Sequence, residues 1–377
     1  MRKKPKHVLL IMLFIFIALS SKAKDWPISS NAEITLVTCG KGNEMHTAFG
    51  HSGLRVVDSI YGVDVVFNYG SSNYTPAQLY YHVLKGDPVL YIAIEPTSLF
   101  LQKYNNENRN VYENTLLLDS AQKHKIFNYL MWNADERNAA YGYNFFTNNC
   151  ATKVRDVLLR YGVPISANGK NSTYRNMVDF NLAMQPWNSL ALYIILGSAA
   201  DQEISPFQSM YIPSRLQQSL KHVSIPQTTI VSRTFAADNP LQQYYAFISI
   251  TILLLLMLAA LSFNKNMAIH GGFIFILLLV TGVIGLLLTV QQFLSTNTFT
   301  QANYNVLWAV PFNFVALALF WKRALLLSYV RYLSAYLFIA TIALFFVPQH
   351  IHYGFFIWVP LIAIYFYSAS YKLSDQS

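Results

Sequence analysis

Charged residues are scarce in this sequence: only 12% of its 377 residues are Asp, Glu, Lys or Arg, against about 25% in a typical soluble domain. The deficit lies in the C-terminal third, which indicates a chain that is partly globular and partly embedded in a membrane. The formal net charge is +9, but the basic residues are dispersed, and no basic helix or aromatic RNA-binding motif occurs. The sequence therefore argues against a nucleic-acid-binding protein.

Several motifs of common enzymes are also missing. The sequence has no glycine-rich phosphate loop and no serine nucleophile elbow, and its only cysteines are Cys39 and Cys150. In an exported domain, two cysteines suggest a structural disulfide as one alternative. A zinc site is another, although the spacing of Cys39, His46, His51 and Cys150 matches no tight pair of zinc ligands. We therefore expect no metal and no cofactor.

The N-terminus has the pattern of an export signal. Basic residues at positions 2–6 precede an apolar run from Val8 to Leu19, and Ser21 and Ala23 are the small residues that a signal peptidase selects. We interpret residues 1–23 as a signal peptide, with an uncleaved signal anchor as the alternative. The exported domain would then comprise residues 24–243.

Alternating apolar residues predict strands in the first half of that domain. Residues 51–57 and 63–69 flank a turn-rich stretch, so they should pair as a hairpin. The hairpin would place Asn68 and Tyr69 beside His51. Three more strands are expected, at residues 33–37, 88–95 and 110–118.

Two helices follow these strands. The first should begin near residue 120, and the second should begin at Cys150, with Asn148 or Asn149 as its N-cap. Apolar residues recur at helical spacing in both, and a Gly-Val-Pro segment at 162–164 ends the second helix. Together with the strands, these helices predict an α+β exported domain.

The C-terminal part, residues 244–377, has the pattern of a membrane domain. Its five apolar runs are each close to the ~20 residues that cross a bilayer as a helix. Lys265, Lys322, Arg323 and Arg331 lie in two of the intervening loops, which should be cytoplasmic, because the other two loops contain no Lys or Arg. This orientation places the exported domain on the outer face of the inner membrane. The runs are 245–263, 272–290, 305–321, 333–348 and 354–371.

The residues predict one candidate catalytic group. A cysteine attacks as its thiolate, so its pKa must be lowered. Cys150 is expected in the first turn of a helix, where the helix dipole lowers the pKa of a thiol. His51 would form an ion pair with the thiolate and move its proton. A third group must orient the imidazole, and Asn68, Tyr69 and the loop residue Glu44 are all candidates. The alternative interpretation is a buried, inert Cys150 and a structural His51.

These segments also resemble a known family. They are similar to the periplasmic domain of Lnb-type lipoprotein N-acyltransferases, which is itself similar to circularly permuted NlpC/P60 (papain-like) folds. The resemblance extends to Arg175, to Asp201 and to the trailing spans, and so covers nearly the whole mature chain. The segments that carry it are Thr38–Gly40, Phe49–Arg55, Phe67–Gly70 and Tyr141–Asp156.

The resemblance implies a function. Such enzymes N-acylate the lipid-modified N-terminal cysteine of bacterial lipoproteins, so the partners would be a phospholipid acyl donor and a diacylated lipoprotein. Carried over by position, Cys150 would be the nucleophile, His51 its base, and Asn68 or Tyr69 a third member. The acyl chain would pass through a thioester on Cys150.

Substrate-binding residues are expected in two places. Asn148 and Asn149 lie beside the nucleophile, while Asn305, Trp308 and Pro311 open the third apolar run, where a groove between spans could admit acyl chains. Three other functions remain open from the sequence: a papain-like cysteine peptidase, a phospholipase at the membrane surface, and a non-enzymatic membrane scaffold.

Overall fold

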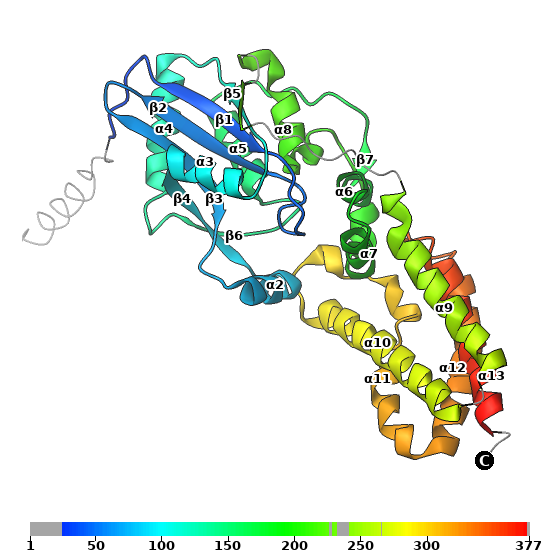
Figure 1. The fold of residues 1–377 in the computed structure, drawn as a ribbon. Coiled ribbons are helices and arrows are strands. Elements are labelled where there is room, and N and C mark those ends of the chain that lie inside the picture. The colour runs from blue at the N-terminus through cyan, green and yellow to red at the C-terminus, as the bar shows by residue number, and fades with distance from the viewer. Residues whose placement is uncertain (1–24, 226–227, 232–240, 265, 375–377) are drawn as a thin grey trace, which may run out of the picture.

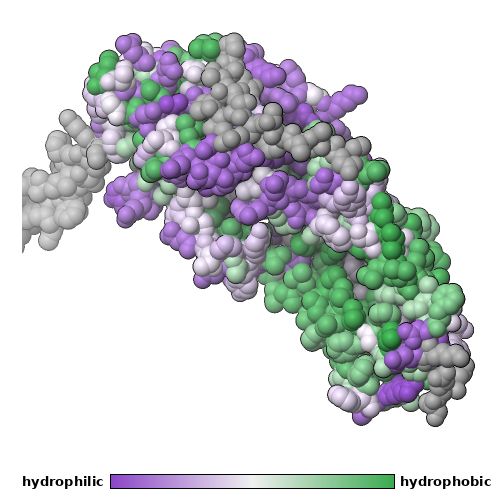
Figure 2. Space-filling model, in the orientation of Figure 1, coloured by the Kyte–Doolittle hydropathy of each residue, from purple (hydrophilic) through white to green (hydrophobic). Residues whose placement is uncertain are grey.

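The computed structural model describes residues 25–225, 228–231, 241–264 and 266–374. The signal peptide expected at residues 1–23 lies outside the described residues. Figure 1 shows two parts, a domain built on a β-sheet and an elongated bundle of helices that extends from it. In Figure 2, hydrophilic residues predominate on the sheet domain and hydrophobic residues cover much of the bundle. The prediction of an α+β domain followed by an all-α domain is confirmed.

Among the described residues, the main sheet has seven strands, and every pairing between neighbours is antiparallel. The expected hairpin is formed by β2 (His51–Asp58) and β3 (Val63–Ser71), and Leu54 pairs with Phe67. A two-stranded sheet, β7 (Ser172–Thr173) with β8 (Glu203–Ile204), lies apart from it. In spatial order the seven strands are β6 (Ala140–Gly142), β4 (Val89–Pro96), β3 (Val63–Ser71), β2 (His51–Asp58), β1 (Glu33–Cys39), β5 (Val111–Thr115) and β9 (Thr228–Val231).

Helices cover both faces of this sheet. On one face, α4 (Ser120–Asn133), α5 (Cys150–Arg160) and α8 (Pro213–Ser219) enclose the main apolar core, which includes Leu54 and Phe67. On the other face, α3 (Thr97–Asn106) packs with Cys39 and Val66 in a smaller cluster. Two helices, α3 and α2 (Pro76–Lys85), were not predicted from the sequence.

The chain then leads toward the helical bundle through short elements. These are α6 (Tyr174–Leu182), α7 (Pro186–Ile195), and the 3₁₀ helices η1 (Ser198–Asp201), η2 (Gln208–Tyr211) and η3 (Lys221–Val223). The bundle contains four helices long and apolar enough to cross a membrane among the described residues. They are α9 (Tyr245–Phe263), α10 (Met267–Leu294), α12 (Arg323–Ala343) and α13 (Phe355–Ser374).

The third apolar run is not one straight helix. Residues 298–307 and 312–321 form two pieces bent by 51° at a short break, so the bundle has five spans only if this pair counts as one. The first piece contains η5 (Thr298–Thr300) and η6 (Tyr304–Leu307), and Pro311 precedes α11 (Phe312–Ala316) and η7 (Leu317–Trp321). Proline has no N–H and cannot continue the helical hydrogen bonds, which explains the break at this point.

The boundaries of the fourth span also differ from the prediction. Helix α12 begins at Arg323, so Arg331 lies inside the helix rather than in the loop that we expected. Its guanidinium reaches the neighbouring helix α13, where Nη2 donates to Ser374 Oγ at 2.8 Å. The long arginine side chain thus finds polar partners at the end of the bundle, as side chains of this type do near membrane boundaries.

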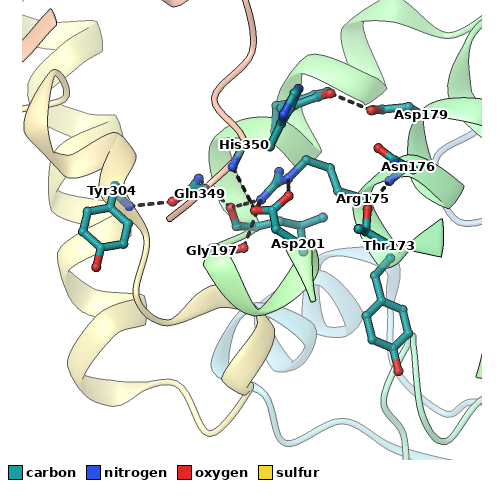
Figure 3. Close-up of polar contacts among 12 residues, drawn as sticks. Thr173, Arg175, Asn176, Asp179, Gly197, Asp201, Tyr304, Gln349 and His350 are labelled. Carbon is teal, nitrogen blue, oxygen red and sulfur yellow. Dashed lines mark hydrogen bonds and ion pairs between the residues drawn. The ribbon is translucent and has the colours of Figure 1, made fainter. Parts of the chain in front are cut away.

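A polar network joins the two parts of the molecule (Figure 3). The buried Arg175 donates from Nε to Asp201 Oδ1 at 2.7 Å, and the backbone N–H of His350, from the bundle, donates to Asp201 Oδ2 at 3.1 Å. Gln349 donates to the carbonyl of Leu196 at 3.0 Å. The network anchors the sheet domain to the loop between α12 and α13.

Apolar contacts reinforce this junction. Phe299, from the loop after α10, packs against Phe146 of the sheet domain with ring centroids 4.5 Å apart. Gly197 allows a close backbone approach there, because a Cβ at this position would lie 1.8 Å from the carbonyl oxygen of Gln301. Since Phe146 precedes Cys150 by only four residues, the junction also fixes the segment that leads to the thiol.

Candidate active site

The imidazole of His51 is held at the start of β2 by a polar chain. His51 Nε2 lies 2.6 Å from Asn68 Oδ1 on the neighbouring strand β3. Asn68 Nδ2 in turn donates to Glu95 Oε1 on β4, also at 2.6 Å. Because the amide nitrogen of Asn68 donates to a carboxylate, its oxygen is the acceptor for His51. Nε2 therefore carries a proton, and Nδ1 is the ring nitrogen left for another partner.

Gly50 makes this position of His51 possible. Its φ is +85°, a left-handed conformation that glycine adopts without steric cost. A Cβ at Gly50 would also lie 2.6 Å from the carbonyl oxygen of Cys39. The Phe-Gly-His segment thus turns the chain tightly into β2 and places the imidazole at the end of the sheet.

The thiol of Cys150 lies at the first residue of α5. Asn149 caps this helix, and its side-chain oxygen accepts from the backbone N–H of Thr152 at 3.0 Å. Helix α5 packs across β2 and β3, which brings its N-terminus to the end of the sheet where His51 lies. The predicted helix start and its cap at Asn149 are both confirmed.

The surroundings of Cys150 favour its thiolate. Burial acts to raise the pKa of the thiol, but the charge of His51 and a hydrogen bond from its imidazole lower it. The backbone N–H groups of Ser52 and Ala151 lower it further, and the net result is a pKa below that of an ordinary thiol. Dipoles at the helix N-terminus act in the same direction.

His51 shifts in the complementary direction. Burial alone would lower the pKa of its imidazole, and the positive charge of Arg109 adds to that effect. The charge of Cys150 and hydrogen bonds with Cys150 and Asn68 outweigh both, so the pKa of His51 is raised. A thiolate and an imidazolium therefore stabilise each other at this position.

Two of the candidates for orienting the imidazole lie elsewhere. Tyr69 points to the opposite face of β3, where its hydroxyl donates to Asn133 Oδ1 at 2.7 Å, because neighbouring strand residues alternate between faces. The Glu44 carboxylate is highly exposed and pairs with His46 Nδ1 at 3.3 Å. Of the three, Asn68 is the one that contacts His51.

The remaining cysteine has a different environment. Cys39 pairs with His51 across β1 and β2 but is buried beside Tyr104, and burial raises the pKa of its thiol to about 12. Both cysteines are free, so the disulfide alternative is wrong. Within the described ranges, no cluster of three or more His, Cys, Asp or Glu side chains could hold a metal ion, and the zinc alternative has no support.

The expected substrate-binding residues have structural partners. Asn148 donates to the carbonyl of Gly142 at 2.6 Å, and Asn149 Nδ2 donates to the carbonyls of Phe145 and Tyr211. These amides hold the segment before the helix in place.

The three residues of the bundle are likewise engaged in packing. Asn305 is buried, and its Nδ2 donates to the carbonyl of Tyr193 at 2.9 Å while its Oδ1 accepts from Trp308 Nε1. Trp308 is itself buried and stacks on Phe355. Pro311 stands at the bend between the two helical pieces. These contacts join the bundle to α7 and hold its own helices together.

Two residues near the thiol were not predicted. Glu95 accepts a hydrogen bond from Asn68. The sequence placed Glu95 in an expected strand, but only the pairing of β4 with β3 shows on which face of the sheet its side chain lies. The hydroxyl of Tyr141 is buried without a hydrogen-bond partner among the described residues. Burial raises the pKa of Tyr141, and the negative charge of Cys150 raises it further, so this hydroxyl lies within electrostatic reach of the thiol.

The fold and this site define a class: a membrane protein with an α+β domain that carries a cysteine and a histidine side by side at one end of its sheet. Comparison with protein families agrees. Residues 25–180 match the Lnb N-terminal periplasmic domain, and residues 234–376 match the Lnb transmembrane domain. The chain belongs to the Lnb family, an acyltransferase family whose members act in lipoprotein biogenesis.

This assignment also gives the location of the N-terminal domain. The sheet domain is periplasmic and the bundle is a transmembrane domain. No curated protein and no solved structure matches the chain. The likeness to permuted NlpC/P60 folds therefore stays a prediction.

Proposed function

We propose that this protein is a lipoprotein N-acyltransferase of the inner membrane, with several spans and with Cys150 as its nucleophile. The acyl donor is a membrane phospholipid, and the acceptor is the α-amine of a diacylglyceryl-cysteine. The observation that supports this most directly is the pairing of Cys150 with His51, which lowers the pKa of the thiol. Family membership supports the lipoprotein substrate class.

In the first half-reaction, the Cys150 thiolate attacks an ester carbonyl of the phospholipid. The carbon–sulfur bond forms, and the tetrahedral intermediate then expels the glycerol oxygen. His51, protonated, gives its proton to that oxygen, so a lysophospholipid leaves and a thioester remains on Cys150. Asn68 keeps the imidazole oriented throughout by accepting from its Nε2.

In the second half-reaction, the α-amine of the lipoprotein attacks the thioester. His51, now neutral, accepts the amine proton at Nδ1, the amide bond forms, and the thiolate of Cys150 leaves. Thioesters suit this step because amines attack them readily, so one difficult transfer is divided into two easier ones.

Both steps pass through an oxyanion that needs hydrogen-bond donors. The N–H of Ala151, at the helix N-terminus, lies next to the sulfur. The hydroxyl of Tyr141, which has no hydrogen-bond partner among the described residues, is a second donor. A buried donor without a competing partner is well suited to bind charge that develops during the reaction. We assign both groups to this role.

The test uses the full-length protein in phospholipid vesicles. Without an acceptor, the intact protein should gain the mass of one acyl chain, and hydroxylamine should remove it. With a diacylated lipoprotein, mass spectrometry should show a third acyl chain on the lipoprotein and one lysophospholipid per transfer. Cys150→Ala should abolish both signals.

Other results would favour the alternatives. Lysophospholipid and free fatty acid without acylated lipoprotein would indicate a phospholipase. Cleavage of the lipoprotein chain would indicate a peptidase. A third acyl chain that is still formed by Cys150→Ala would contradict the proposed nucleophile.

A further inference from the structure

Helix α2 is part of the segment that connects β3 to β4, at the end of the sheet that carries the candidate active site. It leaves β3 just after Gly70, where a Cβ would lie 3.7 Å from Cε1 of His51. It returns at β4, and the carbonyl of Pro88 accepts from the N–H of Tyr143, in the segment that leads to Cys150. Figure 1 shows α2 below the sheet, beside α10. The chain thus connects the site to the bundle at this point.

The C-terminal end of α2 is bonded to the loop that follows α10. The carbonyl of Lys85 accepts from the N–H of Thr296 at 2.9 Å, and the carbonyl of Gly86 accepts from Thr296 Oγ1 at 2.8 Å. Gly86 approaches this loop closely, since a Cβ there would lie 2.4 Å from the nitrogen of Asn297. The contact fixes the height of α2 along the bundle.

At that height the exposed apolar surface of α10 ends. The last residues of α10, Phe293 and Leu294, are 78% and 70% exposed, and the described structure offers them no protein cover. In a transmembrane domain, lipid acyl chains cover such side chains. The polar residue Thr296 follows only two positions later, so α2 is attached where the bilayer meets water.

The residues of α2 suit that location. None of its side chains is buried, although a free helix of this length is marginally stable in water. Leu79, Tyr80, Val83 and Leu84 share one broad side of the helix, while Gln78, His82 and Lys85 occupy the other. Its first turn contains no acidic residue.

Two tyrosines are exposed on this short helix, Tyr80 by 43% and Tyr81 by 62%. Tyrosine is enriched at membrane–water interfaces, where its ring contacts acyl chains and its hydroxyl remains hydrated. An amphipathic helix with an apolar side, basic residues and no buried side chain has the properties of an interfacial helix.

We propose that α2 lies on the outer leaflet of the bilayer, with Tyr80 and Tyr81 among the lipid headgroups. The partner is a phospholipid surface. Through its connections to β3 and β4, this helix holds the end of the sheet that carries His51 toward the lipid. The proposal requires only that the bundle spans the membrane and does not depend on the proposed acyl transfer.

The experiment places a photoreactive side chain on α2 in the full-length protein. Tyr81→p-benzoylphenylalanine is reconstituted in vesicles of phosphatidylethanolamine and phosphatidylglycerol and irradiated, and the peptides are analysed by mass spectrometry. The matched control is Tyr61→p-benzoylphenylalanine, because Tyr61 is 53% exposed in the turn between β2 and β3, at the other end of that hairpin. We expect phospholipid adducts at position 81 and none above background at position 61.

Equal lipid labelling at both positions, or adducts at position 81 to protein alone, would overturn the proposal. The variant Tyr80→p-benzoylphenylalanine guards against a local folding defect at position 81, and it should also yield lipid adducts. The two proposals have separate readouts. If the proposed acyl transfer is wrong, the thioester on Cys150 is missing while the lipid adducts at position 81 are still present.

Discussion

The candidate active site and the junction between the two domains are both built from polar side chains, but they use them differently. At the junction, Arg175 and Asp201 bind each other and backbone groups, and they hold two parts of the chain together. At the site, Asn68 and Glu95 hold one ring, and the Cys150 sulfur interacts with that ring and with two backbone N–H groups. The first arrangement contributes stability, and the second leaves a thiol whose pKa is lowered, as the proposed nucleophile requires.

The largest expected effect separates the two cysteines. Cys150→Ala should lower acyl transfer by about 10⁴-fold or more, because the nucleophile itself is removed. Cys39→Ala should retain transfer and cost about 1 kcal/mol of stability, as the loss of a small buried group does. Acyl transfer and thermal unfolding measured on both variants test this, and comparable activity losses would contradict the distinction between the two thiols.

The next effect concerns His51 and has a defined pH dependence. His51→Ala should slow transfer by about 10²–10⁴-fold, the usual contribution of a general acid–base group. In the unaltered protein the pKa of Cys150 is lowered, so alkylation should continue at pH values where an ordinary thiol is protonated. Without the imidazole, the pH at which alkylation falls off should move upward. Iodoacetamide rates against pH provide the measurement, and an unchanged profile would show that His51 does not act on the thiol.

A substitution at the junction between the two domains should change the stability of the protein rather than its acyl transfer. Arg175→Met leaves Asp201, whose side chain is only 15% exposed, without its charge partner, which should cost about 3 kcal/mol of unfolding free energy. The control is Arg137→Met, where the ion pair with Asp135 is largely exposed and no measurable change is expected. The measurement is the thermal unfolding of both variants in the same detergent. Equal melting temperatures would contradict a stabilising role for the ion pair at the junction.

Two asparagines test the comparison directly. Asn68→Ala should slow acyl transfer by about 10–100-fold, because a misplaced imidazole costs that much, with little effect on folding. Asn305→Ala should lower stability by about 1–3 kcal/mol, since buried carbonyls lose their donor. Alkylation of Cys150 should be normal in Asn305→Ala. If Asn305→Ala impaired alkylation while remaining folded, the separation of the two regions would fail.

The smallest effect is expected at Glu95. Glu95→Gln keeps the shape and replaces a charge-assisted hydrogen bond to Asn68 by a neutral one, so transfer should slow by about fivefold, or about 1 kcal/mol. Glu113→Gln is the matched control, because Glu113 lies on the same face of the sheet but is bonded to Arg55. Initial rates of thioester formation distinguish the two, and equal rates would place Glu95 outside the orienting chain.

Predictions from local patterns succeeded where neighbours in sequence decide the structure. The β2–β3 hairpin, the cap at Asn149 and the helix start at Cys150 all follow from alternation, turn residues and capping chemistry. Local patterns did not show which distant segments would become partners. Asn305 and Trp308 were expected to bind substrate, and that role stays a prediction; in the structure they pack against α7 and the other helices of the bundle. Local sequence carries no information about such pairing.

The sequence by itself determined that a thiol begins a helix, that an imidazole begins a strand, and that apolar spans follow both, because each depends on residues close together in the chain. Only the tertiary structure decided that Asn68, rather than Tyr69 or Glu44, contacts the imidazole of His51, and that Glu95 contacts Asn68. It also decided that α2 reaches the loop after α10. The reason is physical: sheet pairing determines which faces meet, and the packing of α5 against β2 and β3 brings two side chains a hundred residues apart to the same end of the sheet.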